Sequence, residues 1–301
     1  MSPDPGQQPA PAGVVVVDKP TGLTSHQVVG RLRRLAHTRK VGHAGTLDPM
    51  ATGVLVIGIG RATRLLGHLT LAHKSYRATI RLGLATLTDD AEGEVTARPG
   101  AVDIAPQTID AELAELTGEI MQVPSTVSAI KVDGKRSYAR VRSGESVELA
   151  ARPVTVTRFE LISRHDASVD GVPVVDLDVE VDCSSGTYIR ALARDLGTAV
   201  GSAGHLTVLR RTTVGPFGVD RARTLDQLED DLGLVPIAEV AREFFPSKQL
   251  NAEQAAWVRN GRRLSDFAVA DGLTALYGPD GAFLALYRGQ GTDAVADAVF
   301  V

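Results

Sequence analysis

Aromatic residues, cysteine and long apolar runs are all scarce in this sequence. Phe, Trp and Tyr make up 4% of its 301 residues, so a core must be built mainly from Val, Leu, Ala and Ile. The single cysteine, Cys183, excludes an intramolecular disulfide and a multi-cysteine metal site, and it suits a reducing compartment. No apolar run is long enough to span a membrane. We therefore expect a cytoplasmic protein without a membrane segment.

The N-terminal residues also lack the features of a targeting segment. The start, MSPDPGQQPAPAG, has neither the basic head nor the apolar body of a secretory signal, and it is rich in Pro. We expect residues 1–12 to form a disordered tail. A change in composition near Phe244-Phe245-Pro246 predicts a large domain over residues 13–246 and a small β-rich domain over residues 247–301.

The formal net charge of −4 argues against a uniformly basic surface, but the basic residues are segregated. They gather in three segments: Arg31–Lys40, Lys131–Arg142 and Arg259–Arg263. No Lys or Arg occurs between Ala101 and Ile130. Such segments are typical of contact with the phosphates of a polyanion, which predicts that binding weakens steeply with salt. Ordinary solvated helix faces are the alternative.

The spacing of apolar residues predicts both strands and helices. Strands are expected at Gly13–Lys19, Gly53–Gly60, Ser75–Leu82, Val154–Phe159, Val174–Cys183, Leu273–Tyr277 and Ala282–Tyr287. Helices are expected at His26–His37 with Ser25 as N-cap, Arg61–Ala72, Thr108–Leu116, Thr187–Leu196, Thr224–Leu232 and Glu253–Asn260. Alternation of Val or Leu with Asp or Glu indicates a sheet with one solvated face. We predict an α+β fold with a mixed, largely antiparallel sheet flanked by helices.

One stretch, VGHAGTLDPMATGVL at Val41–Leu55, concentrates unusual chemistry. Its single carboxylate, Asp48, precedes Pro49, which disfavours helical backbone angles at Asp48. Gly42 and Gly45 allow turns that other residues resist. Such a loop can hold one Asp in a fixed, partly buried position. A turn that merely joins two elements is the alternative.

This stretch, taken with its flanks, resembles the TruB family of tRNA pseudouridine synthases. The resemblance rests on blocks that occur in the family's order: DKPTGLTSH at Asp18–His26, GHAGTLDPMATGVL at Gly42–Leu55, KSYRATIRLG at Lys74–Gly83, SSGTYIRALARDLG at Ser184–Gly197 and HLTVLRRTTVGPF at His205–Phe217. It implies a pseudouridine-synthase-like fold and an enzyme that isomerises uridine 55 in the T-loop of tRNA, without cofactor or metal. It also implies that residues 247–301 form a PUA-like RNA-binding domain. We expect this enzyme to be a monomer.

The resemblance also implies roles for individual residues. Asp48 would be the catalytic aspartate, Tyr76 the ring that stacks on the target uracil, and Arg190 the partner of the Asp48 carboxylate. Three residues would contact the substrate nucleotides: His43, Tyr188 and Leu209. The pair Lys19 and Pro20 would support the active-site loop.

The residue types suit this chemistry, although each has a simpler explanation. A carboxylate can act as a nucleophile at the sugar or the ring, or as a base at the sugar, and the sequence leaves these open. Arg190 could instead form a helix ion pair with Asp195 or Asp182. Tyr76 could be a core ring whose hydroxyl needs a partner. His43 could cap a turn; no second His or Cys stands at metal-ligand spacing.

Two other functions are compatible with parts of the sequence. Gly-Thr-Leu-Asp can suggest an aspartyl-phosphate site, but a Gly-x-x-x-x-Gly-Lys-Ser/Thr loop and a cluster of acids for magnesium are both missing. The basic segments would equally suit a tRNA-binding or folding factor that needs no catalysis. Asp48→Asn separates such a binding factor from a pseudouridine synthase, because binding would survive and isomerisation would not.

Overall fold

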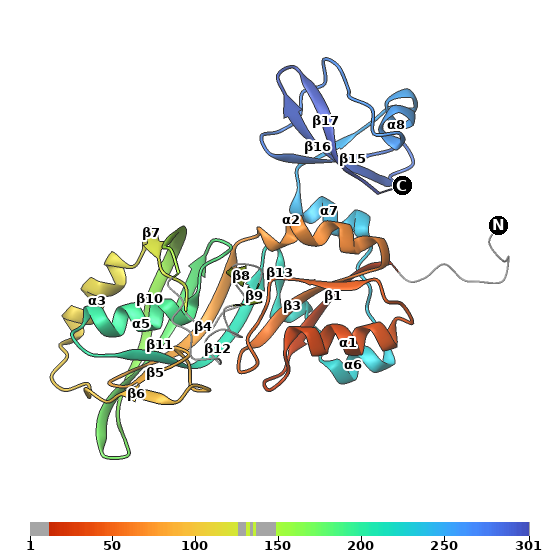
Figure 1. Cartoon of the computed structure of the whole chain (residues 1–301). Coiled ribbons are helices and arrows are strands. Elements are labelled where there is room, and N and C mark those ends of the chain that lie inside the picture. The colour runs from red at the N-terminus through yellow and green to blue at the C-terminus, as the bar shows by residue number, and fades with distance from the viewer. Residues whose placement is uncertain (1–11, 126–130, 133–134, 137–148, 301) are drawn as a thin grey trace. The chain divides into compact units, whose positions relative to one another are not determined.

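The computed structural model describes residues 12–125, 131–132, 135–136 and 149–300 (Figure 1). The predicted tail, apart from its last residue, and most of the predicted basic segment Lys131–Arg142 lie outside this range. The chain divides into two compact units, each described here by itself. The first contains Met1–Asp48, Val54–Thr70 and Gly215–Val301, and the second contains Pro49–Gly53 and Leu71–Val214.

The second unit is built on an antiparallel sheet with the strand order β12-β4-β11-β10-β7. Its strands are β4 (Lys74–Leu82), β7 (Gly118–Gln122), β10 (Arg152–Val169), β11 (Val172–Cys183) and β12 (Gly204–Val214). Helix α5 (Ile189–Ala199) packs on β12 and β4, and α3 (Pro106–Glu115) packs on β10. Two short hairpins complete the unit: β5 (Ala85–Thr86) with β6 (Val95–Ala97), and β8 (Lys131–Val132) with β9 (Lys135–Arg136).

Alternation of side chains explains how this sheet buries one face. Along β4, Tyr76, Ala78, Ile80 and Leu82 are buried, as the sequence predicts. On the other face, Arg77 pairs with Glu180 and Arg81 pairs with Asp176. The acids of β11 thus form a solvated face, which confirms the prediction made from the alternating Val/Leu and Asp/Glu residues.

The first unit combines strands, helices and a second sheet. Its N-terminal part holds β1 (Gly13–Lys19), α1 (Ser25–Leu35), β2 (Val41–Ala44), β3 (Thr52–Ile59), the 3₁₀ helix η1 (Gly60–Leu65) and α2 (Leu66–Thr70). After β12 follow β13 (Phe217–Gly218), η2 (Val219–Arg221), α6 (Leu225–Asp230) and α7 (Ile237–Phe244). Strand β2 pairs antiparallel with β3, and isolated bridges join Val14 to Val235 and Val17 to Arg223.

The C-terminal residues form a four-stranded sheet with the order β14-β15-β16-β17. It contains β14 (Ser247–Gln249), β15 (Leu273–Tyr277), β16 (Phe283–Gln290) and β17 (Asp293–Val299), together with α8 (Ala252–Arg259). Val258 of α8 packs into a core with Leu276, Leu284 and Tyr287. The only tryptophan of the chain, Trp257, lies on α8 with 37% of its surface exposed. The predicted β-rich C-terminal sheet is confirmed; the domain boundaries at residues 12 and 246 stay predictions.

Three local predictions were wrong in detail. The N-cap of α1 is Thr24, not Ser25, because the Thr24 side chain accepts the N–H of Gln27 while Gln27 bonds back to the Thr24 N–H. The predicted helix Arg61–Ala72 is a 3₁₀ helix followed by a short α-helix. Strand β10 runs ten residues beyond the predicted end at Phe159.

The fold class is confirmed as mixed α+β with a largely antiparallel sheet. Within the described residues, no helix is long and apolar enough to cross a membrane.

Candidate active site

The loop that carries Asp48 is anchored on the first turn of α1. The Ser25 hydroxyl accepts the N–H of Leu47 at 2.8 Å and donates to the Leu47 carbonyl at 3.0 Å. Both residues are buried, with 3% of each exposed. Asp48 follows directly and is half-buried. One buried side chain therefore fixes the peptide groups on both sides of Leu47, next to the candidate catalytic carboxylate.

The other predicted residues of the first unit lie on the neighbouring strands. His43 is half-buried on β2, where it pairs in register with Ile57 of β3. Lys19 is the last residue of β1 and is fully buried, and its Nζ donates to the Pro20 carbonyl at 2.8 Å. A buried ammonium bonded to the first carbonyl after the strand fixes the chain where β1 ends, which fits the predicted supporting role.

Tyr76 lies on the buried face of the second unit's sheet, with 7% of its surface exposed. In register it is flanked by Val181 of β11 and Arg211 of β12. Leu209, 6% exposed, is the register partner of Ala78, two residues from Tyr76 on the same face. The structure thus brings Tyr76 and Leu209 together on one apolar surface.

Two buried cations share this face with Tyr76. Lys74 lies two positions before it on β4, and Arg211 is 1% exposed. Burial, together with the positive charge of Arg211, lowers the pKa of Lys74 to about 8. Lys74 donates to the Ala72 carbonyl at 2.7 Å. Burial also raises the pKa of Cys183, the register partner of Lys74, to about 11, so its thiol is protonated at neutral pH.

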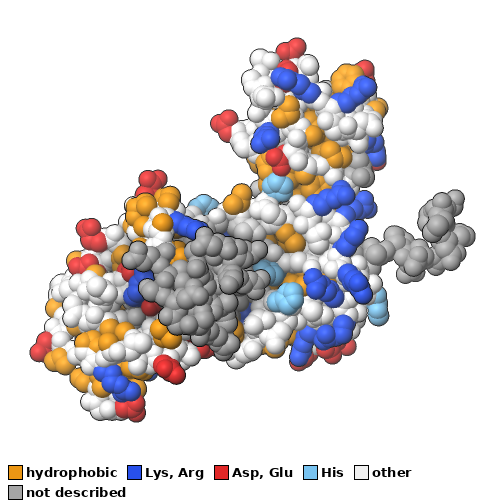
Figure 2. All heavy atoms as spheres, viewed as in Figure 1, with side chains coloured by type: hydrophobic (Ala, Val, Ile, Leu, Met, Phe, Trp, Pro, Cys, Tyr) orange, Lys and Arg blue, Asp and Glu red, His pale blue; other side chains and the backbone are white. Residues whose placement is uncertain are grey.

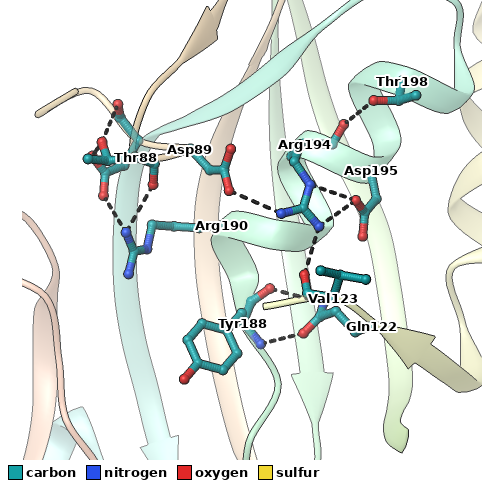
Figure 3. Close-up of polar contacts among 10 residues, drawn as sticks. Thr88, Asp89, Gln122, Val123, Tyr188, Arg190, Arg194, Asp195 and Thr198 are labelled. Carbon is teal, nitrogen blue, oxygen red and sulfur yellow. Dashed lines mark hydrogen bonds and ion pairs between the residues drawn. The ribbon is translucent and has the colours of Figure 1, made fainter. Parts of the chain in front are cut away.

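Arg190 lies near the start of α5 and is bound to a polar turn that precedes β6 (Figure 3). Its Nη1 donates to the Thr88 carbonyl at 2.9 Å and to Asp90 Oδ2 at 3.2 Å. The side chains of Arg190 and Asp90 are 7% and 3% exposed, so this is a buried ion pair. Asp90 is further held by the Thr88 hydroxyl and by the N–H of Glu92.

A second ion pair lies beside the first one in Figure 3. Arg194, one turn after Arg190 on α5, contacts Asp89 Oδ2 at 3.3 Å and Asp195 Oδ1 at 2.8 Å. It also donates to the Val123 carbonyl at 2.8 Å. Burial raises the pKa of Asp89, and the nearby Arg194 opposes that rise. The first two turns of α5 are thus joined to the Thr88–Asp90 turn by two consecutive arginine–aspartate contacts.

Tyr188 is the N-cap residue of α5, and its backbone is held from the neighbouring strand β7 (Figure 3). Its N–H donates to Gln122 Oε1 at 2.8 Å, and Gln122 Nε2 donates to its carbonyl at 3.1 Å. Gln122 is 2% exposed. The paired amide contacts fix the point at which α5 begins.

The structure therefore groups Tyr76 with Leu209 and places Tyr188 two residues before Arg190. The two aspartates suggested as alternative partners of Arg190 form ion pairs with other arginines: Asp195 contacts Arg194, and Asp182 contacts Arg158 at 3.0 Å. The predicted pairing of Arg190 with Asp48 stays a prediction, as do the catalytic roles.

Sequence reasoning missed two residues that organise these sites. Asp90 sat in what the sequence presents as a polar turn, and only the fold brings that turn to α5. Ser25 was interpreted as a helix cap. The spacing Thr24-x-x-Gln27 is a capping box and could have shown that Ser25 was available for another role.

Within the described part of the chain, no group of three His, Cys, Asp or Glu side chains is arranged to hold a metal ion.

Solved structures with the same fold define the class of protein. The Cbf5 complex with Nop10 and Gar1 matches with a TM-score of 0.72 and 26% identity, over 96% of this chain and 85% of that one. An H/ACA ribonucleoprotein bound to a substrate RNA containing 2′-deoxyuridine matches with a TM-score of 0.70 and 25% identity, with the same coverage. The fold is that of the pseudouridine synthases.

Family models narrow this assignment. Residues 33–189 match the N-terminal domain of TruB family pseudouridylate synthase, residues 190–236 the C-terminal domain of tRNA pseudouridylate synthase B, and residues 245–301 the C-terminal part of tRNA pseudouridine synthase II. The tRNA pseudouridine synthase B of Streptomyces griseus is 57% identical over 98% of this chain and 99% of its own length. The enzyme of that name from Cutibacterium acnes is 57% identical over 92% and 93%. The chain belongs to the TruB family, which confirms the resemblance.

Proposed function

We propose that this protein isomerises uridine 55 in the T-loop of tRNA to pseudouridine, with Asp48 as the catalytic carboxylate. Membership of the TruB family supports the reaction class. The observation that carries the assignment of Asp48 is the anchored loop, because the Ser25 hydroxyl binds both backbone groups of Leu47. The Leu47 carbonyl belongs to the peptide that also carries the Asp48 nitrogen, so the backbone leading into Asp48 is held in place, which suits a group that must meet one carbon atom.

The reaction breaks the C1′–N1 glycosidic bond, turns the uracil and joins C1′ to C5; C5 releases its proton to water and N1 takes up a proton. Product and substrate are isomers, so no oxidant or reductant is consumed and no redox cofactor is needed. The ionised Asp48 carboxylate can attack the sugar or the ring, or it can remove a proton from the sugar. The half-buried position of Asp48 supports each of these roles, because a partly desolvated carboxylate is a stronger nucleophile and base.

The target uridine must leave its base stack before this chemistry. Tyr76 would stack on the extruded uracil, and Leu209, on the same buried face, would extend the apolar wall. Tyr188 and His43 would contact the substrate nucleotides. The Lys19–Pro20 contact would support the loop that carries Asp48.

Arg190 would keep Asp48 ionised and oriented. A guanidinium has five N–H donors in a planar fork, so it can bind two carboxylates along different edges. Asp90 holds one of its nitrogens, Nη1, and thereby fixes the plane of the fork. We propose that another edge of the same fork binds Asp48. Asp90 would then act through Arg190, as a positioning residue.

The partner is proposed to be the T-arm of tRNA, bound by a cytoplasmic monomer through segregated basic segments. This monomer can also serve as a tRNA-folding factor, because binding does not require the catalytic carboxylate.

The decisive experiment measures release of tritium from tRNA whose uracil is labelled at C5. Wild-type protein should release one tritium per tRNA, and a transcript with cytidine at position 55 should release none. Asp48→Asn keeps the shape of the side chain but cannot supply an anionic nucleophile or base, so it should bind tRNA normally and release no tritium. Turnover near the wild-type rate would show that the carboxylate is misassigned.

A further inference from the structure

We propose a second RNA site in the first unit, away from the catalytic loop, that takes one ribose-phosphate of the bound RNA chain. It is a hollow of about 270 Å³ between α1 and α6, lined by Arg31, Arg34, Leu35, Leu225 and Glu229. Pockets that hold small ligands usually measure roughly 300–1,000 Å³, so one nucleotide unit suits its size. This inference rests on the proposed tRNA substrate.

The two arginines of the hollow differ from most of the other arginines that the structure describes. Among the described residues, neither Arg31 nor Arg34 forms a side-chain hydrogen bond or ion pair. In the same unit, Arg221 is bound in two places by Glu243, and Arg223 contacts Asp231 at 2.7 Å. Figure 2 shows that Lys and Arg side chains gather over α1. Arg31 and Arg34 thus add positive charge to this surface without a carboxylate of the described residues bound to either of them.

Helical spacing directs these side chains to one place. Arg31, Arg34 and Leu35 stand at positions i, i+3 and i+4, so they share one face of α1. Basic residues near a helix C-terminus also interact favourably with the helix dipole, which alone would explain a cation there. The dipole does not explain why the face is opposed across a hollow by Leu225 and Glu229 of α6. That arrangement supplies charge, an apolar wall and a hydrogen-bond acceptor together.

The chemistry of these groups fits a ribose-phosphate. Guanidinium groups bind phosphate oxygens through paired N–H donors. Glu229 lines the same hollow yet forms no ion pair with either arginine, so its carboxylate is available as an acceptor. It would repel a bare anion, but it can accept a hydrogen bond from the ribose 2′-hydroxyl, the group that distinguishes RNA from DNA. Leu35 and Leu225 would cover the apolar side of the sugar.

The position of the hollow along α1 relates it to the catalytic loop. Ser25, which anchors Leu47 beside Asp48, is in the first turn of this helix. Arg31 and Arg34 follow six and nine positions later, which corresponds to about 9 and 14 Å along the helix axis. An RNA whose uridine reaches Asp48 therefore has neighbouring nucleotides within reach of the hollow.

The test compares two double variants that change the net charge equally. Arg31→Gln with Arg34→Gln removes the proposed contacts, and Arg221→Gln with Arg223→Gln removes two arginines that carboxylates already hold. Filter binding of full-length tRNA and of an isolated T-arm hairpin is measured over a series of salt concentrations. Each phosphate contact adds about 0.7–0.9 to the log–log slope, and the proposed site holds one phosphate, so the first variant should lower the slope by about 0.7–0.9.

In the Arg31→Gln, Arg34→Gln double variant, affinity for tRNA near 0.1 M salt should fall about tenfold, and single-turnover rates at saturating RNA should stay at the wild-type value. The control should keep the wild-type slope. A slope for Arg31→Gln with Arg34→Gln equal to that of the control, on both RNAs, would overturn the site. An effect on tRNA but not on the hairpin would support it and locate the contacted nucleotide outside the T-arm.

Glu229→Ala tests the ribose contact separately. The wild-type preference for tRNA over a DNA chain of the same sequence should shrink severalfold in this variant. An unchanged preference would overturn the role of Glu229. If wild-type protein releases no tritium from labelled tRNA, the proposed function fails; if it does release tritium and both arginine variants bind alike, only the second site fails.

Discussion

Ser25→Ala should slow catalysis although Ser25 touches no reacting atom. The Ser25 hydroxyl bonds the N–H of Leu47 at 2.8 Å and its carbonyl at 3.0 Å, and both residues are 97% buried, since 3% of each is exposed. Alanine fits the same space but leaves both backbone groups without this partner. The loop that holds Asp48 must then open to water or move to find other donors and acceptors.

The cost can be worked out from these contacts. A buried polar group left without its partner costs about 1–3 kcal/mol, and two such groups of Leu47 lose theirs. The Ser25 hydroxyl no longer has to be buried, which recovers part of this cost. We therefore expect the free energy of unfolding to fall by about 2–4 kcal/mol. For a chain of this size, Tm falls by about 2 °C for each kcal/mol, which gives about 4–8 °C. A displacement of about 1 Å at the reacting group can cost on the order of 100-fold in rate, so single-turnover rates should fall 10- to 100-fold.

Thr24→Ala is the matched control, because Thr24 caps the same helix end without a bond to Leu47. Loss of the cap costs about 0.5–2 kcal/mol. Thermal unfolding, filter binding of tRNA and single-turnover tritium release should be measured at a temperature where both variants are folded. Both should bind tRNA as the wild type does, and only Ser25→Ala should turn over slowly. Equal rates for the two variants would refute the argument that Ser25 positions the catalytic loop.

Three further changes test other parts of the structure. Tyr76→Leu should bind tRNA within a few-fold of wild type in filter binding, because one base stack is worth only about 1–3 kcal/mol of the whole interface. It should turn over far more slowly, because the uracil loses the ring that holds it; equal losses of affinity and rate would make Tyr76 a core residue. Asp90→Ala should lower the free energy of unfolding in urea by about 3–5 kcal/mol, because it breaks a buried ion pair with 7% and 3% of the side chains exposed; a loss under 1 kcal/mol would contradict burial of the pair. Gly53→Ala should abolish soluble expression or destabilise the protein severely, since the φ of Gly53 is +98° and an added Cβ would lie 2.1 Å from a backbone carbonyl oxygen of β12. Gly201 is the control: its φ is +75° but an added Cβ would meet open space, so Gly201→Ala should cost only about 1–2 kcal/mol. Similar stabilities of the two glycine variants would contradict the close approach.

Local patterns predicted those elements in which one face is buried along the whole length. Alternation placed Tyr76 and Leu82 on the buried face of β4, and the strands predicted at Leu273–Tyr277 and Ala282–Tyr287 correspond to β15 and to the first part of β16. Strand β10 was predicted too short because its second half, Leu161–Val169, is largely exposed and polar. What holds it is the backbone ladder with β11, a non-local pairing that side-chain polarity does not reveal.

The residues of the candidate site also fall into two groups: those that local sequence reveals and those that only the fold brings together. Residues such as Asp48 and Tyr76 could be proposed because they lie in sequence blocks that resemble a family. Asp90 could not, because its partner Arg190 is 100 positions away in the sequence. Two adjacent acids in a turn are usually solvated, and only the burial of this turn against α5 makes Asp90 an ion-pair partner.

The position of Trp257 gives this protein a built-in optical probe. It is the only tryptophan, and it lies partly exposed on α8, beside the C-terminal sheet. Fluorescence excited selectively at tryptophan therefore reports on the C-terminal sheet alone, whereas far-ultraviolet circular dichroism reports on the helices and strands of the whole chain. Coincident melting curves from the two signals would show that the sheet unfolds together with the rest of the chain, and separate curves would measure its stability individually, without a label or a truncated protein.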